Sequence, residues 1–182
     1  LVLRGGASSL PGAIVVIDLA SGKETVVKQS SHLEIDPGYL AQPQPLTFPT
    51  AHGQMAYGLF YRPTNRDYVG PSQEKPPLLV ISHGGPTGAT SSALSLTIQY
   101  RTSRGFAVFD VNYGGSAGYG REYRNRLRGA WGVVDVEDCV NGALYLVKQG
   151  HVDANRLAIR GGSAGGYTTL SALTFRDVFH VG

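Results

Sequence analysis

The 182-residue chain has little of what stabilises secreted or metal-dependent proteins. Cys139 is its only cysteine, so no disulfide can form within the chain, which favours a reducing compartment. No set of His, Cys, Asp and Glu residues has the spacing of a metal site. No apolar run approaches the roughly 20 residues of a membrane span, and no signal peptide is visible. We expect a cytoplasmic protein with no metal, no cofactor and no membrane partner.

Charge is also sparse, because charged residues make up 16% of the chain and the net charge is +3. The basic residues are spread out except for one cluster, Arg121, Arg124, Arg126 and Arg128. A solvated helix face explains this cluster, and the small basic excess does not indicate a nucleic-acid partner. Hydrophobic residues make up 42%, enough to bury the core of one domain or of one domain and part of another. Because the first residue is Leu1 and not Met, we expect the chain to begin inside a longer protein.

The N-terminal third contains strands but no helical pattern. Residues 13–28 read as a β-hairpin with a turn at 20–23, and such a hairpin needs a larger sheet to be stable. Residues 31–49 carry four prolines and are interpreted as a connector. Residues 54–62 then read as a strand, which we place at a sheet edge.

From residue 78 onward, strands alternate with helices. Continuous apolar runs at 78–81, 106–111 and 157–159 predict parallel strands that are covered on both faces. Apolar spacing predicts a helix over 136–147 that Gly150 ends, and a second helix is expected over 93–104. This alternation predicts an α/β fold with a mostly parallel sheet.

The segment Gly161-Gly162-Ser163-Ala164-Gly165-Gly166 fits the pattern G-x-S-x-G. A predicted strand precedes it and a predicted helix follows it, which is the strand–turn–helix context of a nucleophile elbow. A serine hydroxyl is a weak nucleophile that must meet a base and an acyl carbon together, and a sharp turn presents it to both. We therefore predict that Ser163 is a nucleophile, although a Gly-rich turn or a phosphate cradle would give a similar pattern.

Two further loops follow predicted strands. The first, His83-Gly84-Gly85-Pro86, resembles the HGG-type loop that supplies one oxyanion amide, most plausibly that of Gly85, while Ala164 supplies the other. The second loop, residues 112–120, does not fit the dinucleotide pattern G-x-G-x-x-G because Tyr123 stands where the last glycine is needed. It is interpreted as a binding loop, with Tyr113 and Tyr119 as candidate substrate-binding residues.

The chain has five histidines, and none follows Ser163 at a useful distance except His180. We expect His180 to be a surface or core residue, and His83 to have a structural hydrogen-bonding role. Asp135 and Asp138 stand three residues apart on a predicted helix, where a solvated or locally hydrogen-bonded pair is expected.

Taken in order, these motifs resemble the prolyl oligopeptidase family of serine peptidases, and in particular its acylaminoacyl-peptidase and dipeptidyl-peptidase-like members. The resemblance rests on the HGGP loop, the 112–120 loop, Trp131-Gly132 with Asp135 and Asp138, and the elbow. It implies an α/β-hydrolase fold whose N-terminal part covers residues 50–182. It also implies that residues 1–49 are the remnant of a β-propeller blade and a connector.

The resemblance implies a peptidase that acts on short peptides through Ser163, with Gly85 and Ala164 as oxyanion donors. The family's acid and histidine lie beyond the elbow serine, so the chain is interpreted as a fragment that is inactive alone. It would form homo-oligomers or depend on the rest of the parent chain. Two alternatives remain: an esterase or lipase of the same fold, and a non-catalytic remnant that acts in binding or assembly.

Overall fold

The structure, a computed structural model, describes residues 1–182 as eight strands, four α-helices and two short 3-10 helices. The elements in chain order are β1 (Val2–Ala7), β2 (Leu10–Ile17), β3 (Glu24–Gln29), η1 (Pro37–Tyr39), β4 (Gln44–Pro49), η2 (Ala51–Gly53), β5 (Met55–Tyr61), β6 (Leu78–Ser82), α1 (Leu96–Thr102), β7 (Ala107–Asn112), α2 (Gly120–Asn125), α3 (Val134–Lys148), β8 (Leu157–Gly161) and α4 (Ala164–Phe175).

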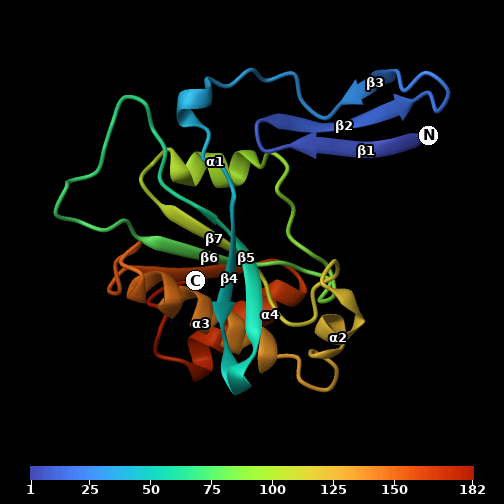
Figure 1. Ribbon diagram of the computed structural model, residues 1–182. Coiled ribbons are helices and arrows are strands. Elements are labelled where there is room, and N and C mark those ends of the chain that lie inside the picture. Colours follow the sequence, from blue (N-terminus) through green and yellow to red (C-terminus); the bar gives the residue numbers. More distant parts are fainter.

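The first three strands form an antiparallel sheet of their own, in the order β1-β2-β3. The predicted hairpin is confirmed, since β2 pairs with β3, and the Asp18 carboxylate accepts the amides of Ala20 (3.0 Å) and Ser21 (2.7 Å) in the turn. Strand β1 escaped prediction because Gly5-Gly6 interrupts its apolar pattern. No side chain of this sheet is fully buried, and Figure 1 shows the sheet set apart from the rest of the chain.

The second sheet has five strands in the order β4-β5-β7-β6-β8. Strand β6 pairs in parallel with β7 and β8, whereas β5 pairs antiparallel with β4 and β7. Because only β5 runs against the others, the sheet is mixed, and the strands predicted from residue 78 onward are its parallel part.

Two sequence-based expectations about this sheet are wrong. Residues 44–49, placed in the connector, form strand β4 at the sheet edge, and β5, expected at an edge, lies inside between β4 and β7. Pro45 and Pro49 led us to interpret the segment as a connector, because proline lacks the N–H that a central strand needs. An edge strand tolerates this loss. The division into domains at residues 49/50 stays a prediction, although β4 belongs to the same sheet as β5.

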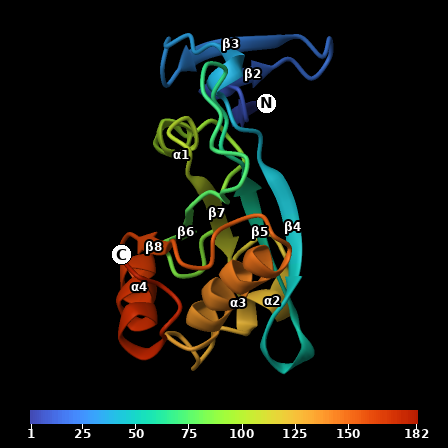
Figure 2. The same ribbon diagram turned by 90° about the vertical axis from the view of Figure 1, so that its left-hand side faces the viewer.

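Helices cover both faces of the five-stranded sheet (Figures 1 and 2). Helices α3 and α4 pack on one face over a large apolar core that includes Phe109 and Ile159. Helix α1 packs on the other face over a smaller cluster around Ile98 and Val108. All six residues of β7 are buried, as the continuous apolar run predicted. This sandwich fixes the carboxyl ends of β6, β7 and β8, where the sequence places its motifs.

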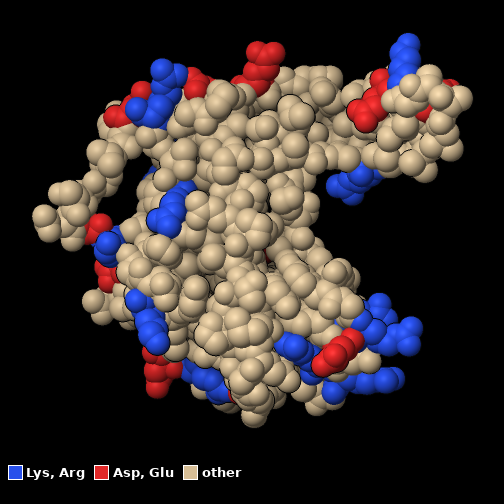
Figure 3. Space-filling model, in the orientation of Figure 1, with Lys and Arg blue, Asp and Glu red and all other residues tan.

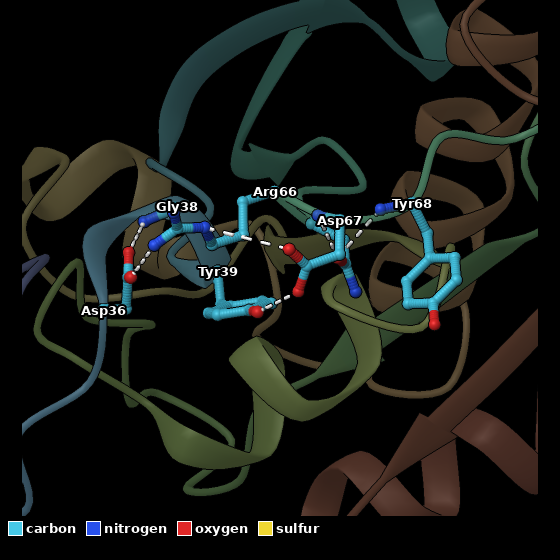
Figure 4. A network of polar contacts seen from close by, with 7 residues as sticks. Asp36, Gly38, Tyr39, Arg66, Asp67 and Tyr68 are labelled. Atoms are coloured by element: carbon cyan, nitrogen blue, oxygen red, sulfur yellow. Dashed lines mark hydrogen bonds and ion pairs between the residues drawn. The ribbon is translucent and has the colours of Figure 1, made fainter.

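The connector between the sheets is tied to the loop that follows β5 by a polar network (Figure 4). The Arg66 guanidinium pairs with Asp36, and the Tyr39 hydroxyl donates to Asp67. The side-chain oxygen of Asn65 accepts the amides of Asp67 (2.9 Å) and Tyr68 (3.2 Å). The network is exposed, so it orients the connector more than it stabilises the fold.

Candidate active site

Ser163 occupies the sharp turn between β8 and α4, as predicted. Its backbone lies at φ 56° and ψ −123°, outside the regions that residues other than glycine prefer. Such a conformation costs on the order of 1–3 kcal/mol and persists only where the surroundings impose it. The Ser163 side chain is exposed at the amino end of α4, where it is free to react.

The glycines of the elbow allow the turn to pack against β6. A Cβ on Gly161 would lie 2.2 Å from the carbonyl oxygen of Gly165, and a Cβ on Gly165 would lie 2.1 Å from that of Ser82. The Ser82 hydroxyl donates to the Gly165 carbonyl at 2.9 Å and locks the contact. Any larger residue at these two positions would push the serine away from its neighbours.

The HGGP loop lies against the elbow. A Cβ on Gly84 would lie 3.2 Å from the Gly162 carbonyl oxygen and 3.5 Å from the Ser163 Cβ. Gly85 has φ 128°, a conformation that glycine adopts readily and other residues do not. The amides of Gly85 and Ala164 donate no hydrogen bond within the chain, so both are free to serve an oxyanion.

His83 holds this loop in place and is not available to activate Ser163. Its Nδ1 lies 2.9 Å from the Gly84 carbonyl oxygen and its Nε2 lies 2.7 Å from the Ser116 hydroxyl. Burial lowers the pKa of His83, so the ring is neutral at pH 7 and carries one proton. Because a carbonyl only accepts, that proton sits on Nδ1, and the Ser116 hydroxyl directs its one proton either to Nε2 or to the Tyr113 carbonyl oxygen, which also lies 2.7 Å away. Both ring nitrogens are therefore occupied.

Tyr113 packs and hydrogen-bonds against the same HGGP loop. Its ring stacks on His83 with centroids 4.3 Å apart, and its hydroxyl lies within donating distance of the carbonyl oxygens of His83 (2.9 Å) and Pro86 (3.0 Å). The side chain is fully buried, so the expectation that Tyr113 contacts substrate does not fit its position. Tyr119 is 39% exposed, stacks on Tyr57 with ring centroids 4.4 Å apart and accepts a hydrogen bond from Asn112 Nδ2 at 3.0 Å, and it remains a binding candidate.

Asp135 and Asp138 are positioning residues that the sequence did not reveal. The expectation of a solvated pair is wrong, because both carboxylates are buried, and of their bonds only that between Asp135 and the Gly132 amide is local. Asp138 accepts the Gly114 amide (2.6 Å) and the Thr50 hydroxyl (2.5 Å), and burial raises its pKa. Asp135 accepts the Gly132 amide (2.6 Å) and the Thr168 hydroxyl. The sequence feature that could have indicated their burial is that both acids stand on the apolar face of the predicted helix.

No histidine of the chain reaches Ser163 as a base. The His180 amide donates to the Leu157 carbonyl oxygen at 2.9 Å, which places His180 at the amino end of β8, opposite the elbow. It is exposed, as expected of a surface residue. Residue Val181 forms a parallel bridge with Ala158 along the outer edge of β8.

Surface hollows lie at both the amino and the carboxyl ends of the parallel strands. One of about 1020 Å³ lies beside the network of Figure 4, lined by Tyr39 and by residues 63–70 and 102–105, at the amino ends of the parallel strands. Another, of about 510 Å³, is lined by Pro86 of the HGGP loop and by residues of α2 and the segment after it. No helix is long and apolar enough to span a bilayer, and no three potential ligand side chains converge on a metal position.

Comparison with known proteins places this arrangement in a family. Residues 92–182 match the prolyl oligopeptidase family, Peptidase_S9. The chain is 35% identical over 129 residues to dipeptidyl aminopeptidase BIII of Pseudoxanthomonas mexicana, a match covering 70% of this chain and 19% of that protein. It is also 35% identical over 112 residues to the acylamino-acid-releasing enzyme of Arabidopsis thaliana, covering 59% of this chain and 15% of that enzyme.

Solved structures agree. A puromycin-hydrolyzing peptidase of Mycobacterium tuberculosis has a TM-score of 0.95 and 47% identity, over 98% of this chain and 27% of that chain. The acylaminoacyl peptidase of Pyrococcus horikoshii has a TM-score of 0.76 and 25% identity, over 98% of this chain and 28% of that chain. The chain thus spans less than a third of the length of each relative, and its fold is that of an α/β-hydrolase. It belongs to the prolyl oligopeptidase family.

Proposed function

We propose that the protein is a serine peptidase that hydrolyses short peptides by acyl transfer through Ser163. The observation that carries the proposal is the strained Ser163 backbone, φ 56°, held between two glycines that no other residue can replace without a clash. Strain of this kind persists where function requires it. The names of the relatives, which are peptidases or acylamino-acid-releasing enzymes, support an amide substrate.

In the proposed mechanism, the Ser163 hydroxyl attacks the peptide carbonyl while a histidine takes its proton. The amides of Ala164 and Gly85 then stabilise the oxyanion, and losing one such donor typically costs about 100- to 1000-fold in rate. Gly85 is proposed as the donor because its amide makes no hydrogen bond within the chain and its loop lies against the elbow. In this fold the acid and the histidine follow the nucleophile in the chain, so we propose that a longer protein supplies them.

The three-stranded sheet supports a second part of the proposal, that residues 1–49 are the end of a propeller blade and a connector. Its strands bury no side chain fully, and Val2, Leu10 and Val27 are exposed. An antiparallel sheet with exposed apolar residues on it needs a neighbouring element to cover them. A neighbouring blade would provide that cover and would restrict access to the elbow to short peptides.

Hydrolysis assays on the complete protein test the proposal. We expect cleavage of aminoacyl amides, short peptides and puromycin, loss of cleavage in Ser163→Ala, and a pH dependence set by a histidine near neutrality. Activity on simple esters with none on amides would favour an esterase of the same fold. A complete protein without a histidine that reaches the Ser163 hydroxyl would make the chain a binding remnant.

A further inference from the structure

The hollow that begins at Pro86 is unusual because its walls carry three arginines and no acid. Arg121 and Arg124 project from α2, and Arg128 follows the helix. The hollow has a volume of about 510 Å³, and a smaller one of about 260 Å³ beside it shares Arg121 and Arg124. In Figure 3 basic side chains gather over α2, with an acidic side chain among them, on the lower border of the large indentation between the two sheets.

This hollow adjoins the candidate oxyanion hole. One wall is formed by Pro86 and Thr87, which directly follow Gly85. The opposite wall is formed by Trp131, whose ring lies 4.8 Å from that of Tyr167 in the first turn of α4. The hollow therefore borders the loop that carries Gly85 and, through Trp131, contacts the elbow helix α4.

The three arginines have no partner of opposite charge. The ion pairs of the chain involve Arg66 and Arg156 only. Arg126 by contrast is already used, since it donates to the Met55 carbonyl (2.8 Å) and lies over the Tyr123 ring. Arg121 and Arg124 are like charges three residues apart on α2, a spacing that disfavours the helix, and Glu122 is the one acid of that helix. The pattern fits an anion that binds between the side chains.

We propose that the hollow is a subsite for a carboxylate of the peptide substrate, either an acidic side chain or the C-terminal carboxylate. The assignment rests on the proposed peptidase function. A guanidinium pairs with a carboxylate through two parallel hydrogen bonds, and Trp131 and Pro86 offer apolar walls to the adjoining carbon atoms. The subsite thus selects peptides that carry negative charge near the cleaved bond.

Matched peptides test this in the complete protein. In the first set, the two peptides of a pair differ only in having Asp or Asn at one position that flanks the cleaved bond. In the second set, they differ only in having a free or an amidated C-terminus. Binding to the Ser163→Ala variant is measured by fluorescence anisotropy, and cleavage by the wild-type protein is measured as kcat/KM. The first set identifies a side-chain carboxylate and the second a terminal one.

We expect a carboxylate to improve binding and kcat/KM by about three- to tenfold, as an exposed charge pair provides, and salt to weaken the preference. Arg124→Gln removes most of the preference, because it lowers kcat/KM for the carboxylate-bearing peptide of each pair more than for its neutral match. Arg104→Gln is the matched control, because Arg104 is exposed on the far side of the sheet and loses the same charge.

The outcomes separate the two proposals. Cleavage of peptides with no carboxylate preference in any pair overturns the subsite and leaves the peptidase standing; an acidic segment of the complete protein covering the arginines would give this result. A preference that Arg104→Gln weakens as much as Arg124→Gln also overturns the subsite, because it reflects net charge alone. Tight carboxylate binding without cleavage of any peptide supports the subsite and contradicts the peptidase.

Discussion

At the scale of single residues, Gly161 and Gly165 are fixed by contacts with backbone atoms that cannot move aside. A Cβ on Gly165 would lie 2.1 Å from the Ser82 carbonyl oxygen, whereas a Cβ on Gly162 would have open space around it. The G-x-S-x-G pattern therefore has a packing reason beside its chemical one: the helix that follows the serine must touch β6.

Gly165→Ala should destabilise the fold by about 1–3 kcal/mol, because the added methyl group forces α4 away from β6. It should also lower fluorophosphonate labelling of the complete protein, since the serine moves with the helix. Denaturant unfolding followed by circular dichroism measures the first effect. Gly162→Ala is the control for unfolding and should cost little; equal losses in both variants would contradict this account of the elbow.

Asp110 is a buried acid outside the site. It lies in β7, accepts a hydrogen bond from the Thr90 hydroxyl through Oδ2, and leaves Oδ1 without a partner. Burial raises its pKa from 3.8 to about 6, against the opposing effect of the Thr90 bond. Since the folded chain holds this proton where the unfolded chain has lost it, stability falls as pH rises from about 4 to about 6.

Asp110→Asn should remove the loss of folding stability that the wild type shows as pH rises. The variant should gain stability relative to the wild type as pH rises from 4 to 7, by up to roughly 3 kcal/mol, with no gain at the acid end. Unfolding curves at a series of pH values measure the difference. A difference that does not change with pH would show that the Asp110 carboxylate is ionised at little cost.

At the scale of elements, helix α3 joins the loops of the site through its two buried aspartates. Asp138 binds the loop after β7 and the turn after β4, and Asp135 binds the loop before α3 and the elbow helix α4. Both acids lie in the first turns of α3, where the helix dipole favours negative charge. One helix thus holds four segments in place, among them the elbow helix α4.

Thr168→Val should break the tie between α3 and α4 and cost about 1–3 kcal/mol, because Asp135 keeps a buried oxygen without its donor. Thr174→Val is the matched control on the same helix, since the Thr174 hydroxyl donates only to the Leu170 carbonyl at an exposed position. Denaturant unfolding of both variants gives the comparison. A Thr174→Val loss as large as that of Thr168→Val would show that the threonine hydroxyls matter only within α4.

The elements that sequence predicted well are those whose pattern is local. Continuous apolar runs gave β6, β7 and β8, and helical spacing gave α3 to within a few residues. Strand β4 was missed because its prolines signal a break locally, and only pairing with β5 makes an edge strand of them. Strand β1 was missed because its glycines carry no apolar alternation.

At the scale of the whole molecule, the site is assembled at one edge of the sheet from segments that lie far apart in sequence. The elbow and the HGGP loop were predictable because each follows a strand and each has a motif. The residues that hold these loops in place were not predictable. The hydrogen bonds of Asp135, Asp138 and Tyr113 depend on which segments the fold brings together. The burial of Tyr113, proposed from the sequence as a substrate-binding residue, was not predictable for the same reason.

The outer side of the elbow helix bears on how the molecule associates. Leu170 and Phe175 are 66% and 71% exposed, whereas Leu157 and Ile159 of β8 are buried in the core. The cover for these two comes from α3 and α4 themselves. Association of the chain through the α4 face stays a prediction, with Leu170 and Phe175 as the side chains that drive it.

The central claim, that Ser163 is the nucleophile, is tested most directly by fluorophosphonate labelling of the complete protein followed by peptide mapping. We expect the adduct on the peptide that contains Ser163, no adduct in Ser163→Ala, and an adduct still on Ser163 in Ser116→Ala, because Ser116 is buried and bonded to His83. An adduct on Ser116, or labelling that survives Ser163→Ala, would contradict the account.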